Sequence, residues 1–346
     1  MNKKLCRHIF LPAFLSLVFL AHPCSAGGQT SYKFIHQIPI GDGRWDYLSI
    51  DAPARRLYVT HETRIVVIDL ETDSLATEIG DTPGVHGFAL APELGRGFSS
   101  NGTEARASVV DLKTLQTTAK VETGKNPDAI LYEPGHGEVY AFNGRDNSVT
   151  IFDAKKLQVV ATIPLGGKPE FAVADKAVGR VYCNIEDTSE IAAIDTGAHK
   201  VVARWSLSPL QRPTGLALDR KNHRLFAGCD KFMAMIDSET GKTLATVPIG
   251  TGVDACEFED ATGLAFASCG NGSVTIAREE APDKLTIVQL LDTKPGARTM
   301  ALDPKTHRIY LTTADFKEEP APRPEMSATR RVPATGTCRV LVYGPD

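Results

Sequence analysis

The chain has 346 residues, 42% of them apolar and 23% charged, with a formal net charge of −4. This apolar share is ordinary for a globular protein and is large enough to build a buried core. The acidic balance and the lack of a run of basic residues argue against a nucleic-acid partner, because binding to phosphates needs clustered Lys and Arg.

Residues 1–26 have the pattern of a secretory signal peptide. Lys3, Lys4 and Arg7 form a basic start, an apolar run follows over residues 9–20, and Ser25-Ala26 offers a small-residue cleavage site. A retained membrane anchor is the alternative, but the apolar run is short for a span and no other long apolar stretch exists. We therefore expect a mature chain over residues 27–346, periplasmic or secreted and without a transmembrane segment. Cleavage removes three positive charges, which changes the net charge from −4 to −7.

Five of the seven cysteines remain after residue 26. They are odd in number and widely spaced, which is not the pattern of a disulfide scaffold. No Cys-x-x-Cys-His occurs, so covalent haem is not expected. We expect each to be a small buried apolar residue: Cys183, Cys229, Cys256, Cys269 and Cys338.

The rest of the chain is built from a repeat that occurs seven times. Each copy has a polar anchor residue before a short apolar strand, and successive anchors are 40 to 45 residues apart. Such a period, with several short strands in each unit, indicates a β-propeller rather than the two or three domains that the length alone suggests. The seven anchors are Asp46, His86, Asp128, Glu170, Thr214, Asp254 and Thr299.

Each repeat predicts four antiparallel strands, which make one blade. In the first repeat these cover residues 47–50, 56–60, 65–69 and 75–79, and the Asp that ends the third strand has the sequence context of a turn. The last repeat lacks a fourth strand, whereas residues 32–39 precede the first repeat and read as one. The sequence thus predicts an all-β, seven-bladed, monomeric propeller over residues 27–346, whose ring is closed by the N-terminal strand in the last blade.

One insertion interrupts the last repeat between its second and third strands. Residues 314–337 are rich in Pro, Glu and Arg and include Glu318-Glu-Pro-Ala-Pro-Arg-Pro-Glu325. This composition buries too little apolar surface to fold alone. We expect a mobile loop.

The repeats resemble the YVTN-repeat β-propeller family. The resemblance is carried by Tyr58-Val-Thr60 and more loosely by Phe98-Ser-Ser-Asn101 in the second strands, and it covers nearly all of residues 32–346. It implies the propeller fold. It says little about function, because the family includes many secreted proteins and shares its architecture with lactonases and haem-d1-binding domains.

In a propeller of this kind the anchors lie in a ring at one mouth of the central channel. The residues that end each second strand lie just outside the ring. Converging carboxylates repel unless a cation or a basic partner balances them. The predicted ligand-binding residues are Asp46, His61, His86, Asn101, Asp128, Asn143, Glu170, Glu186, Asp254 and Arg298.

Oxygen-rich sites with one imidazole suit Ca²⁺, Mn²⁺ or Zn²⁺. The predicted metal ligands are therefore Asp46, His86, Asp128, Glu170 and Asp254. Two alternatives stay open. The basic residues Arg44, Arg212 and Arg298 can pair with these acids instead, or each anchor can cap its own inter-blade turn.

The sequence contains no nucleophile, phosphate-loop or His-Glu-x-x-His motif. We therefore expect a binding or interaction module for a small molecule or a protein. The alternative is a metal-dependent, lactonase-like hydrolase in which the carboxylates hold a cation that activates water.

Overall fold

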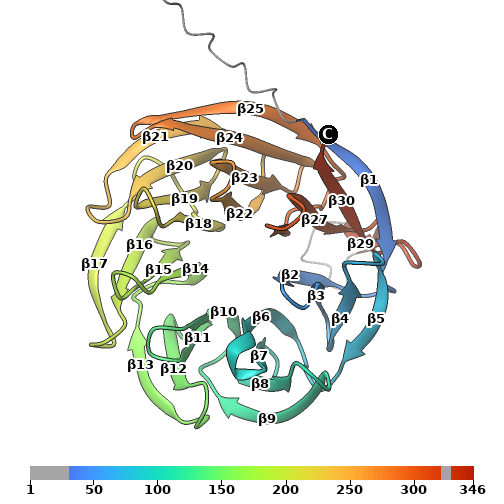
Figure 1. The fold of residues 1–346 in the computed structure, drawn as a ribbon, viewed down its shortest axis with the longest axis horizontal. Coiled ribbons are helices and arrows are strands. Elements are labelled where there is room, and N and C mark those ends of the chain that lie inside the picture. Colours follow the sequence, from blue (N-terminus) through green and yellow to red (C-terminus); the bar gives the residue numbers. More distant parts are fainter. Residues whose placement is uncertain (1–30, 321–328) are drawn as a thin grey trace, which may run out of the picture. The chain divides into compact units, whose positions relative to one another are not determined.

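The computed structural model describes residues 31–320 and 329–346, so the predicted signal peptide lies outside the described residues. Seven four-stranded antiparallel sheets surround a central channel, as Figure 1 shows. This confirms the predicted seven-bladed propeller. Among the described residues no helix is long and apolar enough to span a membrane.

Six of the blades are built from consecutive strands, ordered from the channel outward. Blade 1 contains β2 (Trp45–Asp51), β3 (Arg56–His61), β4 (Arg64–Asp69) and β5 (Ser74–Ile79). Blade 2 contains β6 (Val85–Ala91), β7 (Arg96–Asn101), β8 (Arg106–Asp111) and β9 (Gln116–Glu122), with a 3-10 helix, η1 (Pro92–Leu94), after β6. Blade 3 contains β10 (Pro127–Glu133), β11 (Glu138–Asn143), β12 (Ser148–Asp153) and β13 (Val159–Pro164).

The next three blades follow the same order. Blade 4 contains β14 (Pro169–Asp175), β15 (Arg180–Ile185), β16 (Glu190–Asp195) and β17 (Lys200–Ser206). Blade 5 contains β18 (Leu216–Asp219), β19 (Arg224–Cys229), β20 (Phe232–Asp237) and β21 (Thr243–Pro248). Blade 6 contains β22 (Val253–Glu259), β23 (Leu264–Cys269), β24 (Ser273–Ala281) and β25 (Lys284–Asp292).

Blade 7 joins the two ends of the described chain. Its strands, from the channel outward, are β26 (Met300–Asp303), β27 (Arg308–Thr313), β30 (Arg339–Pro345) and β1 (Tyr32–Pro39). β1 pairs antiparallel with β30, from Tyr32 opposite Pro345 to Pro39 opposite Arg339. The predicted closure by the N-terminal strand is therefore confirmed, and this strand occupies the edge that β30 would otherwise leave unpaired.

The insertion in blade 7 contains two strands that its composition did not suggest. β28 (Phe316–Pro320) pairs with β29 (Thr329–Pro333), and the pairing sets Glu318 and Glu319 opposite Arg331 and Arg330. Opposite charges across an antiparallel pair stabilise it. Phe316 also packs on Trp45 of blade 1, with ring centroids 6.3 Å apart, which anchors this hairpin to the rest of the ring. The insertion predicted as a mobile loop over 314–337 thus contains a β-hairpin, and residues 321–328 lie outside the described part of the chain.

The core consists of apolar layers between neighbouring blades. The second strand of each blade carries an aromatic residue at its third position, and all seven of these side chains are almost completely buried. These aromatic residues are 40 to 44 positions apart, which is the blade repeat. Each therefore occupies the equivalent position in its blade and packs into the apolar layer there. They are Tyr58, Phe98, Tyr140, Tyr182, Phe226, Phe266 and Tyr310. All five cysteines in the described part of the chain are buried, as the sequence predicted, and none of them forms a disulfide.

Asp residues at the ends of the third strands have a structural role. Asp69, for example, accepts hydrogen bonds from the backbone amides of Glu71 and Thr72 at 2.8 and 3.0 Å. Asp111, Asp153, Asp195 and Asp237 bind amides two and three residues ahead in the same way. These contacts are turn stabilisation, as the sequence context indicated.

Candidate functional site at the channel mouth

The anchor residues reach the channel because the first strand of most blades begins with a bulge. The pairing with the second strand is shifted across Trp45–Leu48, Val85–Phe88, Pro127–Ile130, Pro169–Ala172 and Val253–Ala255. A bulge leaves one residue without a ladder partner and turns its side chain away from the regular alternation. Five of the seven anchors lie within these bulges.

Polar side chains of the second strands hold the bulges of the next blade in place. Thr60 donates a hydrogen bond of 2.6 Å to the carbonyl of His86, and Ser100 donates one to the carbonyl of Asp128. In blade 4, the amide of Asn184 donates to the carbonyl of Thr214 at 2.9 Å. The backbone of an anchor is therefore fixed by the preceding blade, which leaves its side chain free for other contacts.

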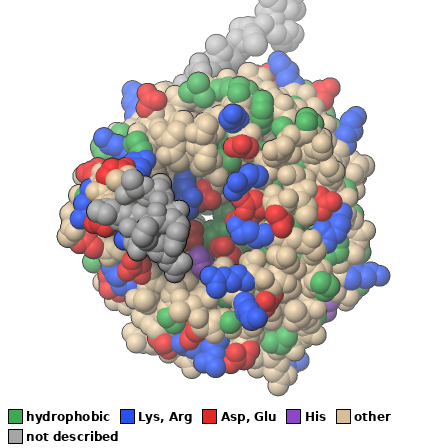
Figure 2. Space-filling view, turned by 180° about the vertical axis from the view of Figure 1, so that it is seen from behind, with side chains coloured by type: hydrophobic (Ala, Val, Ile, Leu, Met, Phe, Trp, Pro, Cys, Tyr) green, Lys and Arg blue, Asp and Glu red, His purple; other side chains and the backbone are tan. Residues whose placement is uncertain are grey.

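A cavity of about 500 Å³ opens at this mouth of the channel. Figure 2 shows acidic and basic side chains and a histidine gathered around the opening. Six carboxylates and three basic side chains line the cavity, so with a neutral His86 its lining carries an excess of three negative charges. The charged lining residues are Asp46, His86, Asp128, Lys168, Glu170, Glu186, Arg212, Asp230, Asp254 and Arg298.

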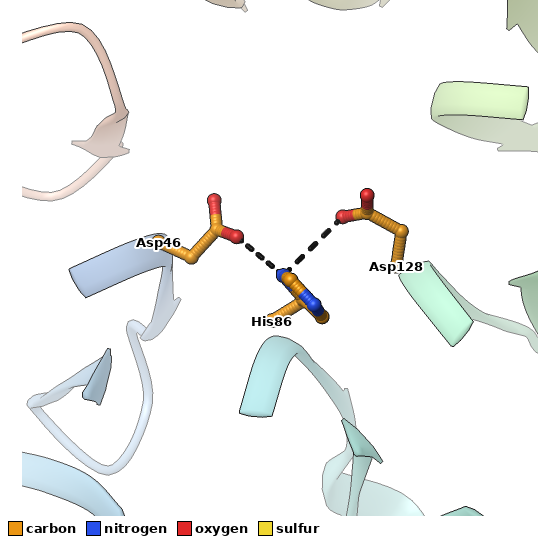
Figure 3. A group of neighbouring side chains, drawn as sticks. All are labelled: Asp46, His86 and Asp128. Carbon is orange, nitrogen blue, oxygen red and sulfur yellow. Dashed lines mark hydrogen bonds and ion pairs between the residues drawn. The ribbon is translucent and has the colours of Figure 1, made fainter. Parts of the chain in front are cut away.

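One part of the lining is a cluster of Asp46, His86 and Asp128 from blades 1, 2 and 3. The Nδ1 atom of His86 lies 2.7 Å from Oδ2 of Asp46 and 3.8 Å from Oδ1 of Asp128. Figure 3 shows the two carboxylates on either side of the imidazole. One ligand atom from each residue lies within 4.8 Å of the other two, which is close enough for a shared metal ion.

The charges around this cluster shift its protonation equilibria. Burial raises the pKa of the Asp128 carboxyl, and the neighbouring charge of Asp46 raises it further. Burial alone lowers the pKa of His86, but the hydrogen bond to Asp46 and the charge of Asp128 outweigh it, so the net pKa is raised. When it is protonated, His86 supplies a positive charge that these two carboxylates share.

The other carboxylates of the lining pair with basic side chains. Lys168 contacts both Glu170 and Glu186, the second at 2.6 Å. Arg212 contacts Glu186 at 2.6 Å, and the Nε atom of Arg298 lies 3.1 Å from Asp254. Glu170 and Asp254 therefore differ from the other three predicted metal ligands, because each already has a basic partner.

Burial nevertheless shifts both of these acids toward the neutral form. It raises the pKa of Asp254 to about 6, against the opposing effect of Arg298. It also raises the pKa of Glu170, with a further contribution from the charge of Asp128. The cavity thus contains buried carboxyls that the protein only partly compensates.

Two aromatic rings narrow the channel beside the anchors. Tyr47 of blade 1 lies with its ring centroid 5.0 Å from that of Phe171 of blade 4, on the other side of the channel. Burial and the surrounding carboxylates raise the pKa of the Tyr47 phenol well above its ordinary value. Tyr47 is therefore a neutral hydroxyl in the lining, and sequence reasoning treated it only as part of a strand.

Seven of the ten predicted ligand-binding residues line the cavity: Asp46, His86, Asp128, Glu170, Glu186, Asp254 and Arg298. The other three, His61, Asn101 and Asn143, are completely buried and do not line it. Their placement at the channel mouth is corrected here, because side chains at the ends of the second strands turn into the blade.

The two asparagines stabilise turns at these positions. Asn101 donates to Ser108 at 2.8 Å, and Asn143 donates to Ser148 and Thr150 at 3.0 Å. Burial lowers the pKa of His61, so its imidazole is a neutral core residue. Of the anchors themselves, Thr214 lines the cavity and Thr299 is buried.

Sequence reasoning missed Lys168, although a signal for it existed. Lys168 stands two positions before its anchor, as Arg44 and Arg212 do before theirs. This shared position marks basic residues on the same face as the ring. Arg44 does not line the cavity, whereas Lys168 and Arg212 do.

The fold is shared with a known structure. The chain matches a structure described as Kuenenia stuttgartiensis hydrazine synthase with a TM-score of 0.69 and 13% sequence identity, over 77% of this chain and 91% of that chain. At this identity the likeness is one of fold alone. No protein-family model matches the sequence. A search of curated proteins finds no match.

Proposed function

We propose that this protein is an exported ligand-binding propeller whose channel mouth holds a divalent cation on Asp46, His86 and Asp128. The observation that carries the proposal is the convergence of one imidazole and two carboxylates from three blades within 4.8 Å. Asp128 has no lysine or arginine within ion-pair distance among the described residues, and its carboxyl is largely buried, so a cation would compensate a charge that the protein leaves only to His86.

The donor set favours particular ions. One nitrogen and two carboxylate ligands suit Mn²⁺ or Zn²⁺ better than Ca²⁺, which prefers six to eight oxygen ligands. Water or a ligand from solution would complete the coordination, because the cavity is open to the solvent side of the ring. Because three side chains fill only part of the coordination shell, a molecule from solution could bind the ion directly.

Membership of the YVTN-repeat family and export to the periplasm or beyond are part of this proposal. The family is supported by the seven buried aromatic residues at the position of Tyr58 in each second strand. Export is supported by the basic and apolar pattern of residues 1–26.

Titration with Mn²⁺ and Zn²⁺ tests the cation site directly. We expect one ion to bind per chain and to raise the melting temperature. An ion that binds only the folded state, present at a free concentration of 100 times its Kd, adds about 2.7 kcal/mol to the free energy of unfolding. Asp46→Asn should abolish binding, measured by calorimetry. Asp230→Asn, which changes a carboxylate of the same cavity outside the cluster, is the control and should bind normally. Equal loss in both variants, or no binding in the parent protein, would contradict the proposal.

A metal-dependent hydrolase is the second candidate, and one observation favours it. Asp254 lies in the same cavity with its pKa raised to about 6, which is near the value that a general base needs at neutral pH. In this case Asp254→Asn should lower Mn²⁺-dependent turnover of a lactone and ester panel by about 10²-fold or more, while Mn²⁺ binding is retained. The absence of turnover in Mn²⁺-loaded parent protein across the panel would leave binding as the function.

A further inference from the structure

Three adjoining cavities form a groove from the channel mouth across blades 4 and 5. The channel-mouth cavity shares Glu186 and Arg212 with a second cavity of about 510 Å³, which also contains Ser189. This second cavity shares Gln211 with a third, of about 570 Å³, and Asp230 lines both the third cavity and the channel mouth. The groove therefore ends at the candidate cation site on one side and in the third cavity on the other.

The third cavity is mainly apolar. It lies between β20, β21 and the connection from blade 4 to blade 5, and its large side chains are Leu207, Pro209, Leu210 and Phe232. Phe232 is the first residue of β20, and 40% of it is exposed. Together with the exposed Pro209 and the half-buried Leu210 it forms a contiguous apolar surface, which is typical of a contact site.

Asp230 gives this end of the groove its charge. Among the described residues that line the third cavity, it is the only charged one. At the channel mouth, Glu170, Glu186 and Asp254 contact Lys168, Arg212 and Arg298, and the cation would balance Asp46 and Asp128. Asp230 is exposed, and its carboxylate forms no hydrogen bond or ion pair with a side chain among the described residues, although its charge helps to raise the pKa of the nearby Arg212. Asp187, in the lining of the second cavity, accepts a hydrogen bond from the backbone amide of Lys168 at 2.8 Å but forms no ion pair among the described residues. Two negative charges thus remain along the groove, and that of Asp230 lies between the apolar cavity and the channel mouth.

We propose that this groove binds an extended peptide segment of another protein, with a large apolar side chain in the third cavity and a neighbouring basic side chain on Asp230. The proposal deepens the binding function given above and rests on it only in taking the channel-mouth face as the binding face. The apolar contact would supply most of the affinity, and the charge would select the sequence.

A peptide fits the groove better than a small molecule does. Small-molecule sites enclose one ligand in about 300–1,000 Å³, whereas these three cavities continue into one another along the surface. Between the apolar end and the channel mouth, Ser189, Gln211 and Arg212 supply donors and acceptors of the kind that a peptide backbone needs. Charge complementarity to Asp230 requires the peptide to be basic.

Fluorescence anisotropy with labelled hexapeptides tests the assignment. A peptide centred on Lys-Phe should bind more tightly than its Glu-Phe and Lys-Ser counterparts. Phe232→Ala should weaken its binding at least about fivefold, the effect of removing an aromatic contact residue. Asp230→Asn should weaken it about threefold and reduce its salt dependence, as expected for an exposed ion pair.

Matched controls come from blade 6. Leu290→Ala removes a more exposed apolar side chain, and Asp283→Asn removes an exposed carboxylate, both away from the groove. Neither should change peptide binding. Equal affinity for the Lys-Phe and Glu-Phe peptides would overturn the proposal. So would control variants that weaken peptide binding as much as Phe232→Ala and Asp230→Asn do. Phenethylamine that binds as tightly as the peptide and depends on Phe232 in the same way would assign the groove to a small amine instead.

Titration of the same variants with Mn²⁺ separates the two proposals. Phe232→Ala and Asp230→Asn should bind Mn²⁺ like the parent protein. A parent protein that binds Mn²⁺ but not the Lys-Phe peptide overturns the peptide assignment alone. Peptide binding without Mn²⁺ binding overturns the cation site alone.

Discussion

Deletion of residues 31–40, which removes β1, is expected to leave the propeller without a stable folded state at room temperature. The deleted protein should then show no cooperative unfolding transition on heating. The deletion unpairs β30 over its whole length and removes the buried side chains of Tyr32, Ile38 and Ile40. Each of these side chains contributes about 1.5–3 kcal/mol by burial, which together is comparable to the whole stability of a typical domain. Circular dichroism melts and gel filtration measure the outcome.

A pair of point substitutions in the same strand sharpens this test. Tyr32 packs edge-on against Phe266 of blade 6 at 5.3 Å, and its backbone amide donates to Gln289 at 2.8 Å. Tyr32→Ala should therefore cost about 3–5 kcal/mol. The control Gln37→Ala changes an exposed position of β1 and should leave the melting temperature within about 1 °C of the parent value. A Tyr32→Ala protein as stable as the Gln37→Ala protein would contradict closure of the ring by β1.

The double variant Asp128→Asn, Glu170→Gln is expected to be more stable than the parent protein at pH 8 without added metal. Burial raises the pKa of both carboxyls in the folded state, and neighbouring carboxylates raise them further, Asp46 for Asp128 and Asp128 for Glu170. The folded protein then binds more protons than the unfolded chain, so the parent loses stability as the pH rises through these raised pKa values. The substitutions remove this loss, and no basic residue is left alone, because Lys168 keeps Glu186 and His86 keeps Asp46.

The expected gain is about 1–2 kcal/mol, or about 2–6 °C in melting temperature for a domain of this size. It should shrink as the pH falls toward 5, where the parent carboxyls become protonated. Stabilisation by Mn²⁺ should be lost in the variant. Asp260→Asn with Glu62→Gln removes two exposed acids elsewhere and is the control for the change in net charge. A double variant that melts below the parent at pH 8 would show that the two acids are structural partners of Lys168 and His86.

The fold could be predicted because it depends on a pattern that is repeated seven times. A single short strand is weak evidence, but seven copies of an anchor and an aromatic strand, five of them followed by an Asp turn, at one period leave little freedom. The missing fourth strand in the last repeat also identified the role of residues 32–39. Each of these features spans only a few residues, and it is their repetition along the chain that predicts a closed ring of blades.

The site could be predicted only in part, because side-chain direction depends on contacts that are distant in sequence. The bulges that turn Asp46 and Asp128 into the channel are shared by most blades, so the anchor ring followed from the repeat. Asn143 has the same polar character, but it turns into its blade to hold Gly124 and Ser148. The strands of the hairpin at Phe316 were missed for a similar reason, since they depend on packing against Trp45 of another blade.

The pairing of Tyr32 with Pro345 also sets the order of events during synthesis. These two residues are 313 positions apart, so the first strand to leave the ribosome must wait for the last one. At about 5–20 residues per second this interval is about 15–60 s, during which six blades can form in turn but the ring stays open. The pairing of β1 with β30 is then the last step of folding. A chain truncated before β30 would retain an unpaired, aggregation-prone β1.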